Sequence, residues 1–362
     1  MQVDEVKMKV IQSFWVYLLV SVSIVVAIIF LVSAYSGYLS PDIHPVVPCL
    51  GLLFPFFLLA NGLMLCLWLV VKRKMALFHV FVFVLGWSPA TDYCPLHFGT
   101  GAQGNRNIKV LSYNVMGLGS ANKKDGKTSL DYILAADADI VCLQEFPVNN
   151  FKVQKKLKKF PHRKVVQVSM GNSVMLCSKY PIVSAKKITF GDSFNGACLF
   201  KVKIDSKTVS VLNVHLESNK LNEDDKKAYK GLLEHPSDTK LRIEGKHLLS
   251  KYAKAAVLRA EQAQCLAEII DQNRKEPMIV CGDFNDTPLS SAHRILSENL
   301  TDAYCVRGCG PGFSYNQSFM YFRIDHILVN QYFEVTDCKV DRSVDDSDHY
   351  PIWCKLKYII NK

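Results

Sequence analysis

The N-terminal part of this 362-residue chain contains three long stretches without a charged side chain. No Lys, Arg, Asp or Glu occurs in Val10–Pro41, Ile43–Val71 or Met75–Thr91. An uncharged apolar run of about 20 residues is long enough to cross the hydrocarbon core of a membrane as a helix. We therefore predict a membrane anchor over residues 1–95, with transmembrane helices at about 11–32, 50–71 and 75–91.

The three runs differ in how strongly they predict a span. Ile11–Val32 and Leu50–Val71 both pass the length test. A cleaved signal peptide is the alternative for the first run, because Lys7 and Lys9 precede it. Its apolar core is too long for a signal peptide, however, and a second full-length run follows. The third run is shorter and contains His79, so the sequence allows either two or three spans.

Positive charges beside the runs predict their orientation. Lys7 and Lys9 precede the first run, and Lys72–Lys74 separates the second from the third. The loop Ser36–Pro48 contains no Lys or Arg. Because cytoplasmic loops are enriched in Lys and Arg, we expect the N-terminus and Lys72–Lys74 in the cytoplasm. Three spans then place the C-terminal domain outside the cytoplasm, as we expect, whereas two would place it inside.

The 12 cysteines do not define a disulfide framework or a metal site. Cys142, Cys177, Cys281 and Cys354 lie within apolar runs typical of buried strands, where free thiols are ordinary core residues. Cys305 and Cys309 lie in a Gly-rich stretch and look like a loop pair that could oxidise or bind metal. Two thiols are too few for a structural zinc site, which needs four ligands.

The net charge of +10 comes in part from two Lys-rich stretches, Lys152–Lys159 and Lys226–Lys254. Such stretches usually form a solvated face. The alternative is an attraction to acidic substrates or anionic lipid head groups.

A linker at 96–107, rich in Gly, Asn and Gln, leads to a domain over 108–362. The sequence pattern of this domain is typical of an α/β fold. Short apolar runs bounded by polar or Gly-containing turns are typical of strands, and consecutive apolar positions indicate strands covered on both faces. The predicted strands are Ile108–Val115, Ile140–Glu145, Ser173–Cys177, Ala197–Ile204, Thr208–His215, Met278–Asp283, Ile324–Val329 and Ile352–Leu356. Helical spacing occurs in Thr128–Ala136 and Tyr252–Asn273.

The polar stretch Asn219–Lys251 interrupts this order of elements. It contains EDDKK, an HPSD turn and few apolar positions. We predict an excursion over the surface that is helical in part. Long excursions of this kind are often functional lids or mobile segments.

Polar residues follow or precede several of the predicted strands, where they could meet in one cleft. These residues are Asn114, Glu145, His215, Asp283, Asn285, Asp325, Asp348 and His349. For each residue alone, a turn is the simpler explanation, because Asn and Asp favour turns. Together, carboxylates and amides suit a hard cation such as Mg²⁺. Metal-assisted attack of water on a phosphate ester fits this set best.

The motifs SYNVMG, LQEF, NVHLES, GDFNDTP, RIDHIL and SDHYPI stand in the order found in the endonuclease/exonuclease/phosphatase superfamily, which includes DNase I and the neutral sphingomyelinases. The chain resembles this superfamily from about residue 108 to residue 357. The resemblance implies an α/β protein with a DNase I-like four-layer α/β/β/α sandwich, here preceded by two or three transmembrane helices. It also implies a metal-dependent hydrolase of phosphoric ester bonds that uses Mg²⁺, with Mn²⁺ as a substitute.

The resemblance also implies roles for individual residues. Glu145 would be the principal metal ligand, with Asn114 beside it and Asp348 assisting. Of the catalytic residues, Asp283 would activate the attacking water and Asn285 would hold the phosphate or that water. His215 would contact a phosphate oxygen. His349, oriented by Asp325, would stabilise the transition state or assist the leaving group.

Two further positions depart from the pattern or are ambiguous. DNase I-like members pair the first His with an acidic residue, whereas the nearest candidate partner of His215 here is Asn172. An Asn would orient the ring without raising its pKa. Arg259 resembles an Arg that is often found on the long helix, although a surface helix residue is an equal interpretation.

We expect a membrane-anchored phosphodiesterase or nuclease, with the lipid bilayer as a partner. Its substrate would be nucleic acid, a phospholipid head group or a small phosphoester. A nuclease needs a basic groove. A lipid phosphodiesterase of sphingomyelinase type would gain from the anchor, although the one Trp of the soluble region, Trp353, is predicted to be buried. The alternative from another class is an inactive membrane-tethered binding module.

Overall fold

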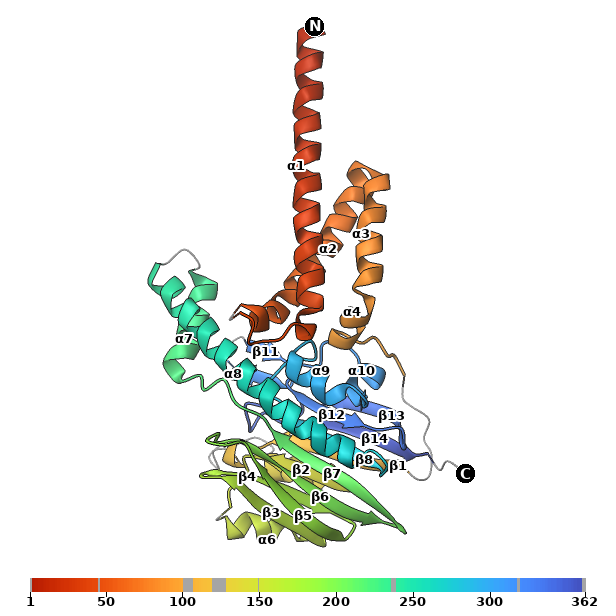
Figure 1. The fold of residues 1–362 in the computed structure, drawn as a ribbon, viewed down its shortest axis with the longest axis vertical. Coiled ribbons are helices and arrows are strands. Elements are labelled where there is room, and N and C mark those ends of the chain that lie inside the picture. The colour runs from red at the N-terminus through yellow and green to blue at the C-terminus, as the bar shows by residue number, and fades with distance from the viewer. Residues whose placement is uncertain are drawn as a thin grey trace.

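The computed structural model describes residues 2–44, 46–99, 107–118, 128–148, 150–235, 239–317 and 320–359. The predicted linker residues 100–106 and the end of the HPSD turn, 236–238, lie outside these described residues. Long helices stand on one side of a sandwich of two β-sheets, and the N-terminus lies at the end of α1 that points away from the sandwich (Figure 1).

The apolar N-terminal region forms helices that run toward and away from the sandwich (Figure 1). They are α1 (Gln2–Ala34), the 3₁₀ turn η1 (Ser36–Tyr38), α2 (Val47–Val71), α3 (Arg73–Leu85) and α4 (Trp87–Tyr93). Ser13–Ala34 and Val47–Val71, with 22 and 25 residues, are long and apolar enough to cross a membrane. α3 and α4 pass that test only as a pair, bent by 63°, so the structure has two helices that could span a membrane, or three candidates if this bent pair is counted as one span.

The first sheet has six strands in the order β13–β14–β1–β2–β4–β3. Its strands are β1 (Asn107–Asn114), β2 (Ile140–Gln144), β3 (His162–Ser169), β4 (Asn172–Ser178), β13 (Phe333–Val340) and β14 (Ile352–Tyr358). β1 and β2 run parallel, and the other neighbours run antiparallel.

The second sheet also has six strands, in the order β5–β6–β7–β8–β12–β9, with β7 and β8 parallel. Its strands are β5 (Ile182–Thr189), β6 (Gly196–Ile204), β7 (Lys207–His215), β8 (Met278–Asp283), β9 (Thr301–Asp302) and β12 (Asp325–Val329). A separate hairpin pairs β10 (Tyr315–Gln317) with β11 (Met320–Phe322).

Helices cover the outer faces of both sheets, which confirms the predicted four-layer sandwich. They are α5 (Ser129–Ala135), α6 (Phe151–Lys156) and η3 (Leu157–Lys159) on the first sheet, and α8 (Thr239–Gln272) and α9 (Ser291–Ser297) on the second. Shorter connections are η2 (Met116–Leu118), α7 (Glu223–Glu234) and α10 (Ala303–Arg307). Buried side chains such as Val110 and Phe200 fill the space between the two sheets.

The polar stretch Asn219–Lys251 contains helices, as predicted, but the long helix after it begins earlier than predicted. Most of it is helical, as α7 and the first part of α8, and α8 begins at Thr239 rather than at Tyr252. The N-terminal part of α8 is largely exposed and therefore lacks the apolar repeat by which a helix is recognised in a sequence. The lysines of α7 pair with neighbouring acids, as in Lys226–Glu223 at 2.9 Å, which fits the predicted solvated face.

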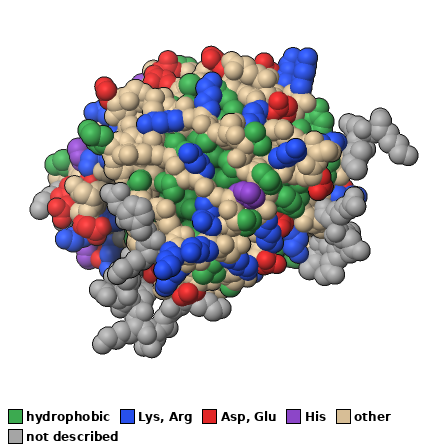
Figure 2. Space-filling view, turned by 90° about the horizontal axis from the view of Figure 1, so that it is seen from below, with side chains coloured by type: hydrophobic (Ala, Val, Ile, Leu, Met, Phe, Trp, Pro, Cys, Tyr) green, Lys and Arg blue, Asp and Glu red, His purple; other side chains and the backbone are tan. Residues whose placement is uncertain are grey.

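The stretch Lys152–Lys159 forms part of α6 and all of η3, at the end of the sandwich far from the N-terminal helices (Figure 1). On that far face, Lys and Arg side chains are spread among other residue types (Figure 2).

The N-terminal helices are packed against the sandwich. Leu289, in the loop before α9, is buried with Phe30 and Phe54 in one apolar cluster. Gly37 approaches this loop so closely that a Cβ atom would lie 2.5 Å from the carbonyl oxygen of Leu289. Arg323 donates hydrogen bonds to the carbonyl oxygens of Tyr93, at 3.2 Å, and of Asp92. The N-terminal helices and the sandwich therefore form one packed unit.

The cysteines behave as predicted, with one correction. Cys142, Cys177, Cys281 and Cys354 are buried and free. Cys305 and Cys309 are also free, but Cys305 lies in α10 rather than in a loop, and its thiol contacts the carbonyl oxygen of Asp92 at 3.3 Å. Trp353, predicted to be buried, is partly exposed between Lys109 and Lys355.

Candidate active site

The structure brings the polar strand-end residues together at one end of the paired sheets. Asn114, His215 and Asp283 are the last residues of β1, β7 and β8, and Glu145 directly follows β2. β1 with β2, and β7 with β8, are parallel pairs, so their carboxyl ends meet at the same edge.

Gly282 allows β8 to bring Asp283 beside His215. Its φ is +147°, and a Cβ atom would lie 1.9 Å from the carbonyl oxygen of Val214 on β7. A side chain at this position would therefore push the two strands apart. The Gly in the GDFN motif is thus needed for the geometry of the site.

Asn114 connects the two sheets across the site. Its amide nitrogen donates to Glu145 Oε1 and to Asp283 Oδ2, at 3.0 Å each, and its oxygen accepts from the backbone N–H of Met116. Glu145 has a φ of +53°, which is uncommon for a residue other than glycine, and strained backbone of this kind clusters at functional sites. The Glu145 side chain remains 38% exposed.

His349 and Asp325 form a buried pair beside Asp283. His349 Nδ1 lies 2.8 Å from Asp325 Oδ2, and Nε2 lies 3.5 Å from Asp283 Oδ2. Burial alone would lower the pKa of His349, but the carboxylates of Asp325 and Asp283 outweigh it and raise this pKa to about 10. The ring is therefore an imidazolium at neutral pH, with Nε2 directed toward Asp283. Burial raises the pKa of Asp283, and His349 opposes that effect.

His215 is held in a different protonation state. The amide nitrogen of Asn172 lies 3.1 Å from His215 Nδ1, so the Asn172 amide orients the ring. Nε2 is buried without a hydrogen-bond partner and lies 3.6 Å from Asp283 Oδ2. Burial lowers the pKa of His215, which keeps the ring neutral. Asn172 is thus the partner that the sequence indicated.

The remaining predicted residues also lie at this site. The backbone N–H of Asn285 donates to Asp283 Oδ1 at 2.8 Å, and the Asn285 amide donates to the carbonyl oxygen of Leu216. Asn285 has a φ of +52°, which Asn tolerates. Asp348 is partly exposed, and the ring edge of Tyr315 packs on His349, with the ring centres 5.3 Å apart.

A pocket of about 300 Å³ opens in front of these residues. Glu145, His215, Asp283, Asn285, Asp348 and His349 line its polar floor. Asn114 and Asp325 lie behind this floor and contact its residues. All eight predicted site residues therefore gather at one pocket.

Arg259 is not a surface residue, and that interpretation was wrong. It is fully buried, and its Nε donates to Asp286 Oδ2 at 2.9 Å. Its guanidinium also donates to the carbonyl oxygen of Glu217 and to Asn219. Arg259 thus ties α8 to the segments that follow Asp283 and His215. The sequence carried a signal for Asp286, because it is the second Asp of GDFNDTP.

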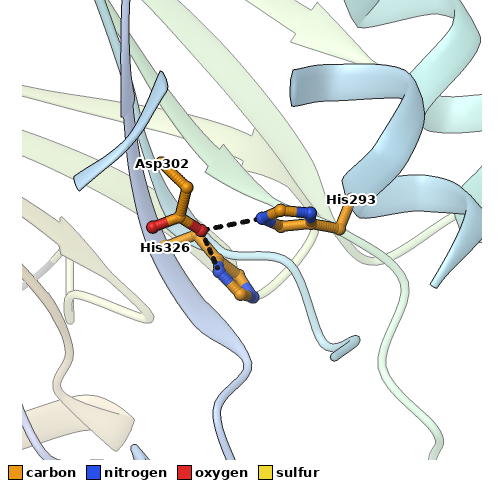
Figure 3. A group of neighbouring side chains, drawn as sticks. All are labelled: His293, Asp302 and His326. Atoms are coloured by element: carbon orange, nitrogen blue, oxygen red, sulfur yellow. Dashed lines mark hydrogen bonds and ion pairs between the residues drawn. The ribbon is translucent and has the colours of Figure 1, made fainter. Parts of the chain in front are cut away.

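A second buried cluster, formed by His293, Asp302 and His326, was missed by sequence reasoning (Figure 3). Asp302 Oδ2 accepts from both imidazoles, at 2.8 Å from His293 Nε2 and 3.2 Å from His326 Nδ1. Its other oxygen caps α10 through the N–H groups of Tyr304 and Cys305. These contacts join α9 and α10 to β12. The cluster therefore helps to fix the position of β12, the strand that begins with Asp325.

The match to known families agrees with this geometry. Residues 111–349 match the model described as Endonuclease/Exonuclease/phosphatase family, which spans every predicted site residue. The chain belongs to this family, and it is a metal-dependent hydrolase of phosphoric ester bonds. Residues 16–93 match a second model, described as Domain of unknown function (DUF8431). No curated protein matches the chain.

Solved structures resemble the sandwich. D. rerio TDP2 complexed with single strand DNA product matches at a TM-score of 0.50 and 15% identity, covering 70% of this chain and 100% of that one. The human Nocturnin catalytic domain with bound sulfate anion matches at 0.49 and 17%, covering 70% and 95%. A Bacteroides thetaiotaomicron family protein matches at 0.48 and 18%, covering 71% and 100%. At 15% identity, the likeness to TDP2 shows the fold alone.

Proposed function

We propose that this chain is a membrane-anchored, Mg²⁺-dependent phosphodiesterase. The observation that carries the proposal is the contact set around Asp283, where Asn114, His215 and His349 surround one buried carboxylate. These three side chains are an amide, a neutral imidazole and an imidazolium. Such a set can hold a phosphate and an attacking water beside the carboxylate.

The donor groups suit a divalent cation. Glu145 presents a partly exposed carboxylate at the pocket, and Asp348 lines the same pocket. Carboxylate oxygens are the ligands that Mg²⁺ prefers, and Mn²⁺ would substitute. When bound, the cation would polarise the phosphoryl oxygen and neutralise developing charge. The Asn114 oxygen accepts one hydrogen bond from Met116 and keeps a second lone pair for the cation, while its amide nitrogen positions Glu145 and Asp283.

The side chains of the chain itself supply the remaining steps. Asp283 would accept a proton from the attacking water, with Asn285 holding its other oxygen. His215 would donate a hydrogen bond from Nε2, the nitrogen that Asn172 does not contact, to a phosphate oxygen. His349 would donate from Nε2 to a phosphate oxygen or to the departing oxygen, while Asp325 fixes the ring through Nδ1.

Metal dependence tests this proposal. The full chain in detergent or nanodiscs should release p-nitrophenol from bis-p-nitrophenyl phosphate with Mg²⁺, lose this activity in EDTA and regain it with Mg²⁺ or Mn²⁺. Glu145→Gln should raise the half-saturating Mg²⁺ concentration by about 10- to 100-fold, because it weakens a ligand. The exposed Glu298→Gln is the control. EDTA-resistant turnover, or an unchanged Mg²⁺ response in Glu145→Gln, would contradict the proposal.

We also propose that the catalytic domain lies outside the cytoplasm. The α2–α3 turn, which contains Lys72, points away from the sandwich, as does the start of α1 (Figure 1). If the basic turn is cytoplasmic, the sandwich is on the opposite side. A reporter that is active only outside the cytoplasm should show activity when it is fused after Lys362. Activity of a cytoplasmic reporter at the same position would reverse this assignment.

A further inference from the structure

One wall of the active-site pocket is apolar and comes from segments outside the polar strand ends. It includes Leu52, Leu221, Tyr229, Leu248, Met320 and Phe322. These residues belong to α2, to the segment before α7, to α7, to α8 and to the β10–β11 hairpin. The polar floor around Asp283 and this apolar wall therefore face the same space.

Leu52 connects the pocket to the membrane anchor. It lies in the second turn of α2, within the candidate span Val47–Val71. Here α2 packs against α8, with the Cys49 thiol 3.9 Å from the carbonyl oxygen of Leu249. Part of the active-site wall is thus the first section of an apolar helix that could cross a membrane.

Exposed aromatic side chains indicate where the first turns of α2 would lie relative to the surface of a membrane. Tyr38 and Trp87 are 69% and 67% exposed at the ends of the helices nearest the sandwich, and Trp15 is 57% exposed near the start of the candidate span Ser13–Ala34. Trp and Tyr at two levels are typical of the two interfaces of a membrane. Gly51 packs so closely on Ser36, two residues before Tyr38, that a Cβ atom would lie 3.0 Å from Ser36 Oγ. If α1 and α2 cross a membrane between these two aromatic levels, Leu52 would lie at the level of the lipid head groups.

The pocket offers few unpaired positive charges to a polyanion such as a nucleic acid. Among the described residues, its lining contains the cations Lys220 and Lys226 besides the histidines. Lys220 Nζ lies 2.6 Å from Glu217, and Lys226 Nζ lies 2.9 Å from Glu223. Binding to a nucleic-acid backbone relies on several cations that neutralise phosphates. The stretch Lys152–Lys159 lies at the far end of the sandwich (Figure 1).

We propose that the substrate is a lipid phosphodiester, whose phosphate lies at the Asp283–His349 floor and whose apolar chain lies against Leu52 and its neighbours. This inference rests on the proposed phosphodiesterase function. Water oxygen forms a new bond to phosphorus, one phosphorus–oxygen ester bond breaks, and the proton of the water passes to the departing oxygen. The anchor helix α2 is then part of the substrate site as well as a tether.

Chain-length dependence tests the inference. The full chain in phosphatidylethanolamine–phosphatidylglycerol nanodiscs is assayed with methyl, butyl, hexyl and octyl p-nitrophenyl phosphates and Mg²⁺. We expect kcat/KM to rise roughly two- to fourfold per methylene while the chain still fits the wall. Leu52→Trp, which fills the pocket from α2, should lower the octyl-to-methyl ratio at least about tenfold. Leu248→Trp fills the pocket from α8 and should do the same if Leu52→Trp does not fold.

Leu63→Trp is the matched control, because Leu63 lies on the same helix, is 63% exposed and does not line the pocket. It should keep the wild-type chain-length dependence. As a measurement without turnover, a phosphatidylglycerol with a photoreactive acyl chain should label Leu248 and Met320 in EDTA.

The outcomes separate this inference from the proposed function. Hydrolysis of all esters with no chain-length dependence, an unchanged ratio in Leu52→Trp, or no label on Leu248 and Met320 would overturn the lipid assignment and leave the phosphodiesterase standing. Higher kcat/KM for a single-stranded oligonucleotide than for the octyl ester would assign the pocket to nucleic acid instead. No hydrolysis of any diester would overturn the proposed function and this inference with it.

Discussion

Replacement of Asp283 by Asn should lower kcat for bis-p-nitrophenyl phosphate by about 10³-fold or more, the upper part of the range for loss of a general base. Within the part of the chain that the structure describes, Asp283 is the one carboxylate that contacts Asn114 and lies within 3.6 Å of both His215 and His349. An amide cannot accept the proton of the attacking water. It would also place a donor against Asn114 or against the N–H of Asn285, whichever way it is turned.

The fold should survive this change, because the backbone pairs of β8 with β7 and β12 hold the strand in place. Circular dichroism of the purified variant checks this point, and the exposed Asp271→Asn on α8 is the control that should retain wild-type turnover. Turnover in Asp283→Asn close to the wild-type value would remove Asp283 from the mechanism. Loss of secondary structure would contradict its placement at an open pocket.

Replacement of His349 by Gln should lower kcat by about 10²- to 10³-fold, because the group that donates to the phosphate or to the departing oxygen is lost. Asp325→Asn should have a smaller effect, since Asp325 acts through the orientation and charge of the imidazole. The double variant tests this dependence. If Asp325 acts only through His349, the double variant should be no slower than His349→Gln.

Two results would contradict the pairing. Wild-type kcat in His349→Gln would show that the imidazolium is not needed for turnover. Fully additive losses in the double variant would show that Asp325 has a separate role, although it is completely buried behind the ring. The comparison uses kcat at saturating Mg²⁺, so that weaker metal binding does not contribute to the measured loss.

The strands that sequence patterns predicted and those that they missed differ in their place in the sheets. Each of the predicted strands, such as β2 and β8, has a neighbour on both sides. The missed strands β3, β5, β9 and β13 are the four edges of the two sheets, and β10 and β11 form a separate hairpin. Interior strands are covered on both faces and appear as continuous apolar runs. Edge strands such as β5, in which only one residue is buried, carry polar and charged residues that resemble those of loops.

The residues of the candidate site could be picked out from the sequence for a related reason. Its residues stand directly at the ends of interior strands, so each motif carries its own position in the sheet. Arg259 could not be placed in this way, because helical spacing does not reveal that Asp286 lies opposite it. The cluster of His293, Asp302 and His326 was missed because its members come from three elements that meet only in the folded chain.

The sequence by itself predicted the long apolar N-terminal helices, the α/β/β/α class and the eight polar residues that lie at the pocket, because charge-free runs and strand-end motifs are local patterns. Only the tertiary structure decided what surrounds those residues. It decided that Asn114 turns its amide nitrogen to Glu145 and Asp283, that Asn172 lies against Nδ1 of His215, and that Leu52 of α2 stands in the pocket wall. The physical reason is that each of these contacts joins residues that are distant in the chain, so their geometry depends on the packing of the sheets and helices that carry them.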